Sequence, residues 1–296
     1  MSPFTLSWVI RKNEQNQLIR DFLLQHHISK TTLTAIKFKG GKITVNGIEQ
    51  NVRYRLQEGD QLTVTFPHEQ TTVKGEDIPL QICYEDRDVL VINKPPHMNT
   101  IPSREHPSGS LANAIIGYYE KIGYEATVHV VTRLDRDTSG LVLVAKHRYV
   151  HHLFSQLQQK GNVKRTYQAF VEGTLKTKKG TIEAPIGRKD TSIIEREVRE
   201  DGQYACTHYE VIAEKRTASH VQLRLETGRT HQIRVHMSYL GHPLLGDELY
   251  GGSRKYIHRQ ALHCSELSFY HPLKEDILSF RAPIPEDMLT AWKECE

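Results

Sequence analysis

The first 67 residues alternate between helix-like and strand-like patterns of apolar positions. Apolar side chains recur at helical spacing over residues 18–23, and Ser29 is a suitable N-cap for a second helix over residues 30–38. Alternating segments at residues 42–47 and 61–66 are typical of strands, and the first of them runs into an Asn-Gly turn. This pattern predicts a small α/β unit of two helices and short strands.

The pattern changes after this unit. Residues 68–81 are polar and charged, so we interpret them as a linker between residues 1–67 and a larger domain over residues 82–296. Apolar runs predict strands at residues 88–92, 141–145, 166–171, 209–213 and 221–225. Helical spacing predicts helices at residues 111–119, 149–158 and 230–240. Because these elements do not alternate regularly, we expect an α+β domain on a mixed, largely antiparallel sheet flanked by helices.

Composition narrows the class of protein. The chain has 296 residues, 38% of them hydrophobic and 25% charged, as in ordinary soluble proteins. No apolar stretch is long enough to cross a bilayer, and the N-terminus lacks the basic leader of a secretory signal. The four cysteines are scattered, and the 17 histidines form no catalytic zinc motif. We therefore expect a cytoplasmic protein with free thiols, no membrane partner, no metal and, by default, a monomeric state.

Charge is unevenly distributed. Residues 1–67 contain nine Lys or Arg and five Asp or Glu, so they hold the whole net charge of +4, while the remainder is neutral. A basic unit attached to a neutral domain suggests an accessory module that meets a polyanion. An ordinary soluble surface with a modest excess of basic residues explains the same charge distribution equally well.

The segment Val131–Gly140 carries the strongest candidate chemistry. It places Asp135 between Arg133 and Arg136, and a buried strand is predicted directly after it. Opposite charges nearby favour the ionised carboxylate that a nucleophile requires. A solvated Arg–Asp turn would have the same sequence, and the residues alone leave both interpretations open.

A family resemblance bears on this choice. Val131–Gly140 resembles the HRLDxxTSG signature of the RluA/RluD-type pseudouridine synthases, in which the aspartate is the catalytic nucleophile. That role carries over to Asp135. Thr132 stands where the family usually has histidine, which puts a supporting or RNA contact in question rather than the chemistry.

Further segments match the same family in the same order. Lys164–Gly173 resembles its KxYxAxVxG strand, with Tyr167 in the tyrosine position. Thr227–His236 resembles its TGRxHQIRVH motif, whose second arginine pairs with the catalytic aspartate and corresponds to Arg234. Two other segments also follow the pattern, Asn93–Pro96 and Leu240–Gly251. The residues before position 68 resemble the S-four-like RNA-binding module, whose helices present cations to RNA, here Lys30, Lys37 and Lys39.

The resemblance implies an isomerase that converts specific uridines of structured RNA to pseudouridine without a cofactor. Large-subunit ribosomal RNA is favoured over tRNA as the substrate. Because uracil can depart as a stabilised anion, one carboxylate suffices; Asp135 would either add to the sugar or abstract a proton to give a glycal. Tyr167 would stack on the base or donate a hydrogen bond to it, and Arg133 would occupy the space that the flipped base leaves.

Other interpretations of these residues remain open. Tyr167 fits a core strand, Arg133 a salt bridge to Asp137, and Arg229 a structural position as well as a phosphate contact. The histidines of the helix after the strand are expected to be ordinary surface residues: His147, His151 and His152. Alternative functions are a tRNA pseudouridine synthase, a non-catalytic RNA-binding or ribosome-assembly factor, and a glycosidase, although no second carboxylate stands in a comparable motif.

Overall fold

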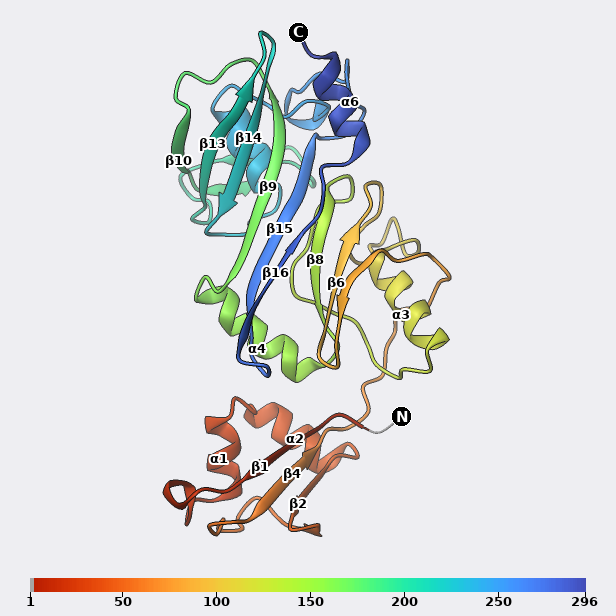
Figure 1. The fold of residues 1–296 in the computed structure, drawn as a ribbon, viewed down its shortest axis with the longest axis vertical. Coiled ribbons are helices and arrows are strands. Elements are labelled where there is room, and N and C mark those ends of the chain that lie inside the picture. The colour runs from red at the N-terminus through yellow and green to blue at the C-terminus, as the bar shows by residue number, and fades with distance from the viewer. Residues whose placement is uncertain (1–2) are drawn as a thin grey trace.

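The computed structural model describes residues 3–296 and contains a small N-terminal sheet and a large ten-stranded sheet (Figure 1). The small sheet has the order β1-β4-β2-β3 and is entirely antiparallel. Its elements are β1 (Thr5–Val9), α1 (Ile19–Gln25), α2 (Lys30–Phe38), β2 (Lys42–Val45), β3 (Ile48–Glu49) and β4 (Gln61–Thr65). Ser29 caps α2 as predicted, because its side-chain oxygen accepts a hydrogen bond from the Thr32 amide at 3.1 Å.

The large sheet runs in the order β10-β13-β14-β9-β15-β8-β6-β5, with β16 paired to β15 and β7 paired to β8. Its strands are β5 (Ile82–Glu85), β6 (Val89–Lys94), β7 (His129–Val130), β8 (Ser139–Ala145), β9 (Val163–Glu172), β10 (Lys179–Glu183), β13 (Cys206–Glu214), β14 (Ala218–Leu225), β15 (Leu262–His271) and β16 (Asp276–Arg281). A separate hairpin joins β11 (Ile186–Arg188) and β12 (Arg196–Val198). The prediction of an α+β fold on a mixed, largely antiparallel sheet is confirmed.

The centre of the large sheet is where β8 lies between β6 and β15. All seven residues of β8 are buried, which explains its continuous apolar run. Among the described strand pairs of the large sheet, only β8–β15 is parallel. This pairing places Gly140 opposite Cys264. Gly140 has φ +116°, and a Cβ there would lie 2.3 Å from the Cys264 carbonyl oxygen. Glycine is therefore required at the start of this strand.

The helices of the larger unit lie around this sheet. They are α3 (Leu111–Lys121), α4 (Arg148–Gln159), α5 (Gln232–Tyr239) and α6 (Glu286–Glu294), with a short 3-10 turn at Glu248–Tyr250; a second 3-10 turn, Lys12–Glu14, lies in the N-terminal unit. The helix α4 contacts β7, β8 and β9, and α5 contacts β12 and β13. Within residues 3–296, no helix combines the length and apolar character needed to cross a bilayer.

The polar segment 68–81 is docked onto the larger unit. The Glu69 carboxylate accepts a hydrogen bond from the Arg148 amide at 3.0 Å, at the start of α4. The Asn113 side chain in α3 donates to the Lys74 carbonyl at 2.9 Å. These contacts tie the segment to two helices of the same unit.

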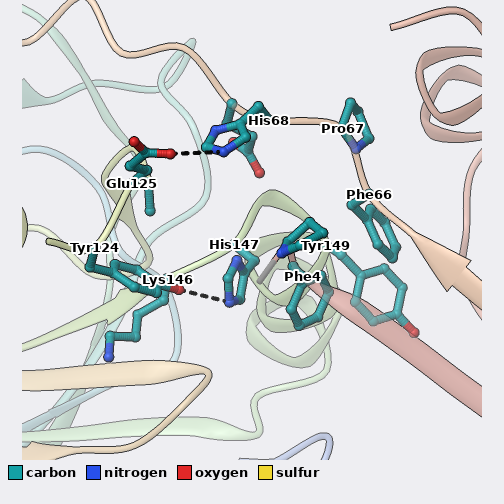
Figure 2. Close-up of a pocket in the computed structure, with 12 residues that line it drawn as sticks. Phe4, Phe66, Pro67, His68, Tyr124, Glu125, Lys146, His147 and Tyr149 are labelled. Atoms are coloured by element: carbon teal, nitrogen blue, oxygen red, sulfur yellow. Dashed lines mark hydrogen bonds and ion pairs between the residues drawn. The ribbon is translucent and has the colours of Figure 1, made fainter. Parts of the chain in front are cut away.

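The N-terminal unit packs against the end of the large sheet through an aromatic contact (Figure 2). Phe4 stacks on His147 with ring centroids 3.9 Å apart, and the Tyr149 hydroxyl donates to the His26 carbonyl at 2.9 Å. The expectation that His147 and His151 are ordinary surface residues is wrong, because both are half-buried. Burial lowers the pKa of His147 to about 4, so this ring packs in its neutral form.

The contact between the linker and α3 predicts the sign of one substitution. Gly117 lies inside α3, and a Cβ there would be 2.1 Å from the Glu76 carbonyl oxygen. At a solvent-exposed position inside a helix, replacing glycine by alanine raises the free energy of unfolding by about 1 kcal/mol. Here we expect Gly117→Ala to lower the free energy of unfolding by about 1–3 kcal/mol, because the linker backbone must move.

Chemical denaturation measures that free energy, and trypsin cleavage after Lys74 reports on the linker. Cleavage should be faster in the variant, since the displaced segment becomes accessible. A gain in stability with unchanged cleavage would contradict the close packing of the linker on α3.

Candidate active site

Asp135 lies in the loop between β7 and β8, and hydrogen bonds hold this loop from two sides. The Thr100 hydroxyl donates to the Leu134 carbonyl at 2.7 Å and accepts from the Leu134 amide at 3.2 Å. From the other side, the buried Arg259 donates to the Asp137 carbonyl at 3.1 Å. The backbone on both flanks of Asp135 is therefore fixed by side chains that are distant in the sequence.

A buried lysine also fixes the loop that carries Asp135. Lys94 ends β6, is fully buried, and donates to the carbonyls of Pro95, Met98 and Arg136 at 2.8, 2.8 and 3.1 Å. Three acceptors match the three N–H donors of the ammonium group. Burial lowers the pKa of Lys94 to about 7, and the Asp135 and Asp137 carboxylates act in the opposite direction. Lys94 thus joins the turn after β6 to the loop that carries Asp135.

Arg234 connects Asp135 to a second carboxylate. Its Nη1 lies 3.4 Å from Asp135 Oδ2. Its Nε donates to Asp247 Oδ2 and its Nη2 donates to Asp247 Oδ1, both at 2.7 Å. Arg234 and Asp247 are buried, whereas the Asp135 side chain remains 28% exposed. The fork-to-fork pair fixes the guanidinium plane, and its remaining edge faces Asp135. This contact agrees with the predicted Asp135–Arg234 pair.

Two more groups border the carboxylate. His231 precedes α5 with φ +56°, and its Nε2 lies 3.9 Å from Asp135 Oδ2. Its Nδ1 lies 2.7 Å from the Tyr250 hydroxyl, and burial lowers the pKa of His231. Arg234 also stacks on the Tyr250 ring, with 4.9 Å from guanidinium carbon to ring centroid. A neutral imidazole thus completes the wall without adding a second cation.

Tyr167 is a buried residue of β9, as a core position would be, but it also lines the small pocket around Asp135. Its hydroxyl accepts a hydrogen bond from Arg165 Nη1 at 3.2 Å. Burial raises the pKa of Tyr167, so the phenol stays neutral. Tyr167 is therefore a core residue whose position also borders the pocket around Asp135.

The pocket around Asp135 opens into a large cleft. The cleft is lined by residues 99–103, 130–136, 158–166, 224–231 and parts of β13 and β15. Arg133 and Arg229 line both the pocket and the cleft, and both are exposed. Asp137 pairs with His97 at 2.9 Å, and among residues 3–296 it forms no salt bridge with Arg133. That alternative for Arg133 is wrong, because the turn directs Asp137 towards His97.

Thr132 has a structural position. It is buried, and its hydroxyl oxygen accepts a hydrogen bond from the Leu143 amide of β8 at 2.9 Å. The residue that departs from the family pattern therefore anchors the loop to the strand beside it.

The structure does not bring all candidate residues together. Lys30, Lys37 and Lys39 are exposed on and just after α2 of the N-terminal unit, and the cleft lining does not include them. They belong to a separate basic surface.

Several site residues were missed by the sequence interpretation: Lys94, Thr100, Asp247, Tyr250 and Arg259. Lys94 and Asp247 lie in segments already matched to the family pattern, so the motif contained a signal for them. Thr100 and Arg259 act through side chains that reach a distant loop, and local sequence carries no such information.

The arrangement supports nucleophilic chemistry with a single carboxylate. The Asp135 carboxylate is partly exposed towards the pocket, and the Arg234 guanidinium contacts it at 3.4 Å, so a nucleophile at this position has access and a fixed direction. Both oxygens of Asp247 are occupied by Arg234. Asp247 is therefore unsuited to be the proton-donating partner that a two-carboxylate glycosidase requires.

Comparison with known proteins agrees with this geometry. Residues 88–239 match the profile of the RNA pseudouridylate synthase family. The chain is 56% identical over 272 residues to the "Uncharacterized RNA pseudouridine synthase YjbO" of Bacillus subtilis (strain 168), covering 91% of this chain and 96% of that protein. It is 40% identical to "Ribosomal large subunit pseudouridine synthase D" of Vibrio parahaemolyticus, covering 84% and 81% of the two chains. Among solved structures, "Human RNA Pseudouridylate Synthase Domain Containing 1" aligns with a TM-score of 0.60 at 26% identity, covering 71% and 85%.

The buried pair predicts a large stability effect. Asp247→Ala leaves the Arg234 guanidinium buried without its main partner, so we expect the free energy of unfolding to fall by about 3–5 kcal/mol. Denaturant titration measures the loss. The matched control, Asp201→Ala, removes an exposed partner of Arg199 and should change stability little. Equal effects of the two substitutions would show that Asp247 does not hold Arg234 in place.

Proposed function

Because the chain belongs to the RNA pseudouridylate synthase family, we propose that it isomerises specific uridines of large-subunit ribosomal RNA with Asp135 as the nucleophile. Membership makes the chain an RNA pseudouridine synthase, an intramolecular isomerase. The observation that carries the residue assignment is the connected set Asp135–Arg234–Asp247 at the end of an arginine-lined cleft.

The reaction needs one ionised carboxylate near the sugar and room for the base to turn. The bond from ribose to N1 breaks, the uracil rotates, and a new bond forms from the ribose to C5. C5 then loses its proton and N1 gains one, so the reaction is an isomerisation with no net change in atoms. Uracil departs as a stabilised anion, so no acid is needed at the leaving group. Addition of Asp135 to the sugar and abstraction of a proton to give a glycal both begin from this same carboxylate.

The target base has to leave its stack to reach Asp135, at a cost of roughly a few kcal/mol. Arg133 is exposed beside the pocket and is placed to enter the vacated space. Arg229 lines the same cleft as a candidate phosphate contact. Tyr167 lines the pocket with its hydroxyl held by Arg165, which leaves its ring as a surface for the uracil.

We also propose the division of labour along the chain: residues 1–67 bind RNA, residues 68–81 link, and residues 82–296 catalyse. Lys30, Lys37 and Lys39 are exposed in the basic N-terminal unit. Phe38 beside them is 73% exposed, with Lys37 Nζ 4.9 Å from its ring centroid. An exposed ring among cations is suited to stacking on an unpaired base.

The choice of ribosomal RNA rests on the relatives. The relative from Vibrio parahaemolyticus is named for the large ribosomal subunit, and it aligns over most of both chains. Mapping pseudouridines in total RNA from cells with and without this protein tests the choice directly. Loss of sites in large-subunit ribosomal RNA would support it, whereas loss of tRNA sites alone would overturn it.

The nucleophile assignment predicts a specific loss of activity. Asp135→Asn keeps the shape of the side chain but removes its charge and nucleophilicity. We expect pseudouridine formation to fall by about 10⁴-fold or more, with RNA affinity changed less than about tenfold. Pseudouridine formation on RNA from the deletion strain and a binding titration measure the two quantities.

The control is Asp137→Asn, two residues along the same loop. It loses the ion pair with His97 but leaves Asp135 and Arg234 in place, so its activity should stay within about tenfold of the wild type. Comparable turnover by Asp135→Asn and the wild type would disprove the assignment.

The role of the N-terminal unit predicts a change in salt dependence. Replacing Lys30, Lys37 and Lys39 together by Gln should weaken RNA binding and reduce the slope of log affinity against log salt by about 2–3. The exposed Lys176 and Lys293, which lie outside that unit, serve as control positions for the same substitution. An unchanged slope would contradict a phosphate-binding role for the three lysines.

A further inference from the structure

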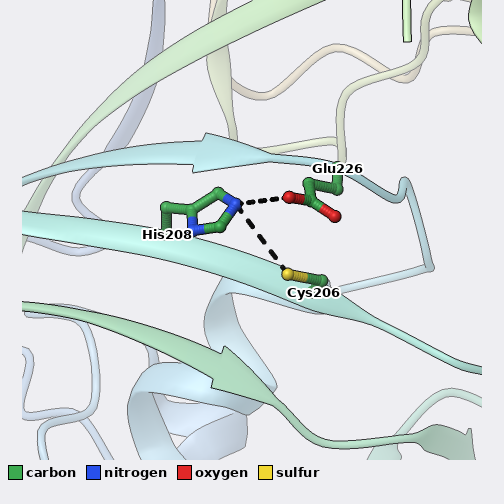
Figure 3. A group of neighbouring side chains, drawn as sticks. All are labelled: Cys206, His208 and Glu226. Carbon is green, nitrogen blue, oxygen red and sulfur yellow. Dashed lines mark hydrogen bonds and ion pairs between the residues drawn. The ribbon is translucent and has the colours of Figure 1, made fainter.

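A cysteine, a histidine and a glutamate meet where β13 pairs with β14 (Figure 3). Cys206 and His208 are two residues apart on β13, so their side chains share one face of the strand. Glu226 follows directly after β14, the neighbouring strand, and its amide donates to the Cys206 carbonyl at 3.2 Å. Strand pairing thus brings together three potential metal ligands.

Their atoms lie at distances suited to a shared cation. His208 Nε2 is 3.9 Å from Cys206 Sγ and 2.7 Å from Glu226 Oε1, and all three ligand atoms lie within 4.8 Å of one another. Zinc bonds of about 2.0 Å to nitrogen and oxygen and about 2.3 Å to sulfur require neighbouring ligands about 3.5 Å apart. The Glu226 side chain is exposed, so it can move to meet this geometry.

The imidazole is already oriented for such a role. His208 Nδ1 lies 2.9 Å from the Thr181 hydroxyl on β10, and Nε2 points to both Sγ and the carboxylate. An outer hydrogen bond of this kind fixes the ring and the tautomer of metal-binding histidines. In the metal-free cluster Nε2–H donates to Glu226; when Nε2 binds a metal, the imidazole proton moves to Nδ1 and is donated to Thr181.

We propose that Cys206, His208 and Glu226 form a binding site for a zinc-class divalent cation. A thiolate, an imidazole and a carboxylate are the ligand types that Zn²⁺ prefers, and water completes the tetrahedron. On binding, the metal replaces the thiol proton, which passes to solvent, and the imidazole binds through Nε2. Burial raises the pKa of the Cys206 thiol, so the metal-free cluster holds a neutral thiol.

The second polar cluster of this kind offers a contrast. Asp86, Asp88 and His271 also lie within metal-ligand distance of one another. However, Lys274 Nζ lies 2.7 Å from Asp86 Oδ2 and already supplies the positive charge. No Lys or Arg among residues 3–296 is paired with Glu226, whose ion-pair partner is His208.

The position of the proposed metal site would let a bound cation change the charge of the cleft wall. His208 and Glu226 line the same cleft as Arg133 and Arg229. A bound dication would cancel the negative charge of Glu226 and make this wall more attractive to phosphate. This consequence rests on the proposed function, whereas metal binding itself does not.

Spectroscopic titration of the metal-free protein with Co²⁺, without RNA, tests the site. The wild type is expected to bind a single equivalent and to show the charge-transfer band of a cobalt–thiolate bond. Cys206→Ser should lose the band, while Cys83→Ser, which changes an exposed cysteine outside the cluster, should keep it. Competition by Zn²⁺ should remove the band and report the zinc affinity.

A second variant keeps the test decisive if Cys206→Ser does not fold. Glu226→Gln changes an exposed side chain and should weaken Zn²⁺ affinity by about tenfold or more. Glu210→Gln on β13, the strand that carries Cys206 and His208, is the matched control and should leave the affinity unchanged. Absence of the band in the wild type, its persistence in Cys206→Ser, or an unchanged Zn²⁺ affinity in Glu226→Gln would each overturn the proposal.

Discussion

The site depends on the guanidinium of Arg234, which is buried between two carboxylates with different tasks. Asp247 pairs with the edge formed by Nε and Nη2, at 2.7 Å each, and Asp135 lies 3.4 Å from Nη1. Burying a charge is favourable only when its donors are satisfied, so Asp247 stabilises Arg234 inside the domain. Arg234 can then direct Asp135, whose own side chain stays open to the pocket.

The remaining contacts serve to keep that geometry rigid. The loop of Asp135 is held through its backbone, by Lys94 and Thr100 from one side and by Arg259 from the other. These groups bind backbone atoms rather than the carboxylate, so they fix its position and leave its oxygens free of their hydrogen bonds. The parallel contact at Gly140 sets where the loop enters β8. Precise placement of this kind matters because a misplaced catalytic group costs orders of magnitude in rate.

The N-terminal unit and the catalytic sheet are joined by specific contacts, not only by the chain. Phe4 packs on the neutral ring of His147, and the segment of residues 68–81 is tied to the first turns of α3 and α4. The basic surface of α2 is consequently held in a defined relation to the cleft. For an enzyme that selects one uridine in a folded RNA, this arrangement would let two surfaces read one substrate.

Local sequence determined several of the elements and pointed to the main candidate groups. The alternation and helical spacing predicted β8, α2 and the α+β class, and the ordered motifs identified Asp135, Tyr167 and Arg234, because periodicity and motif spacing are local properties. Tertiary structure alone decided which groups meet. Thr100 and Arg259 reach the Asp135 loop from distant segments, and His208 meets Glu226 across 18 residues only because β13 pairs with β14. Contacts of this kind depend on strand register and side-chain direction, and neither is encoded by the residues around them.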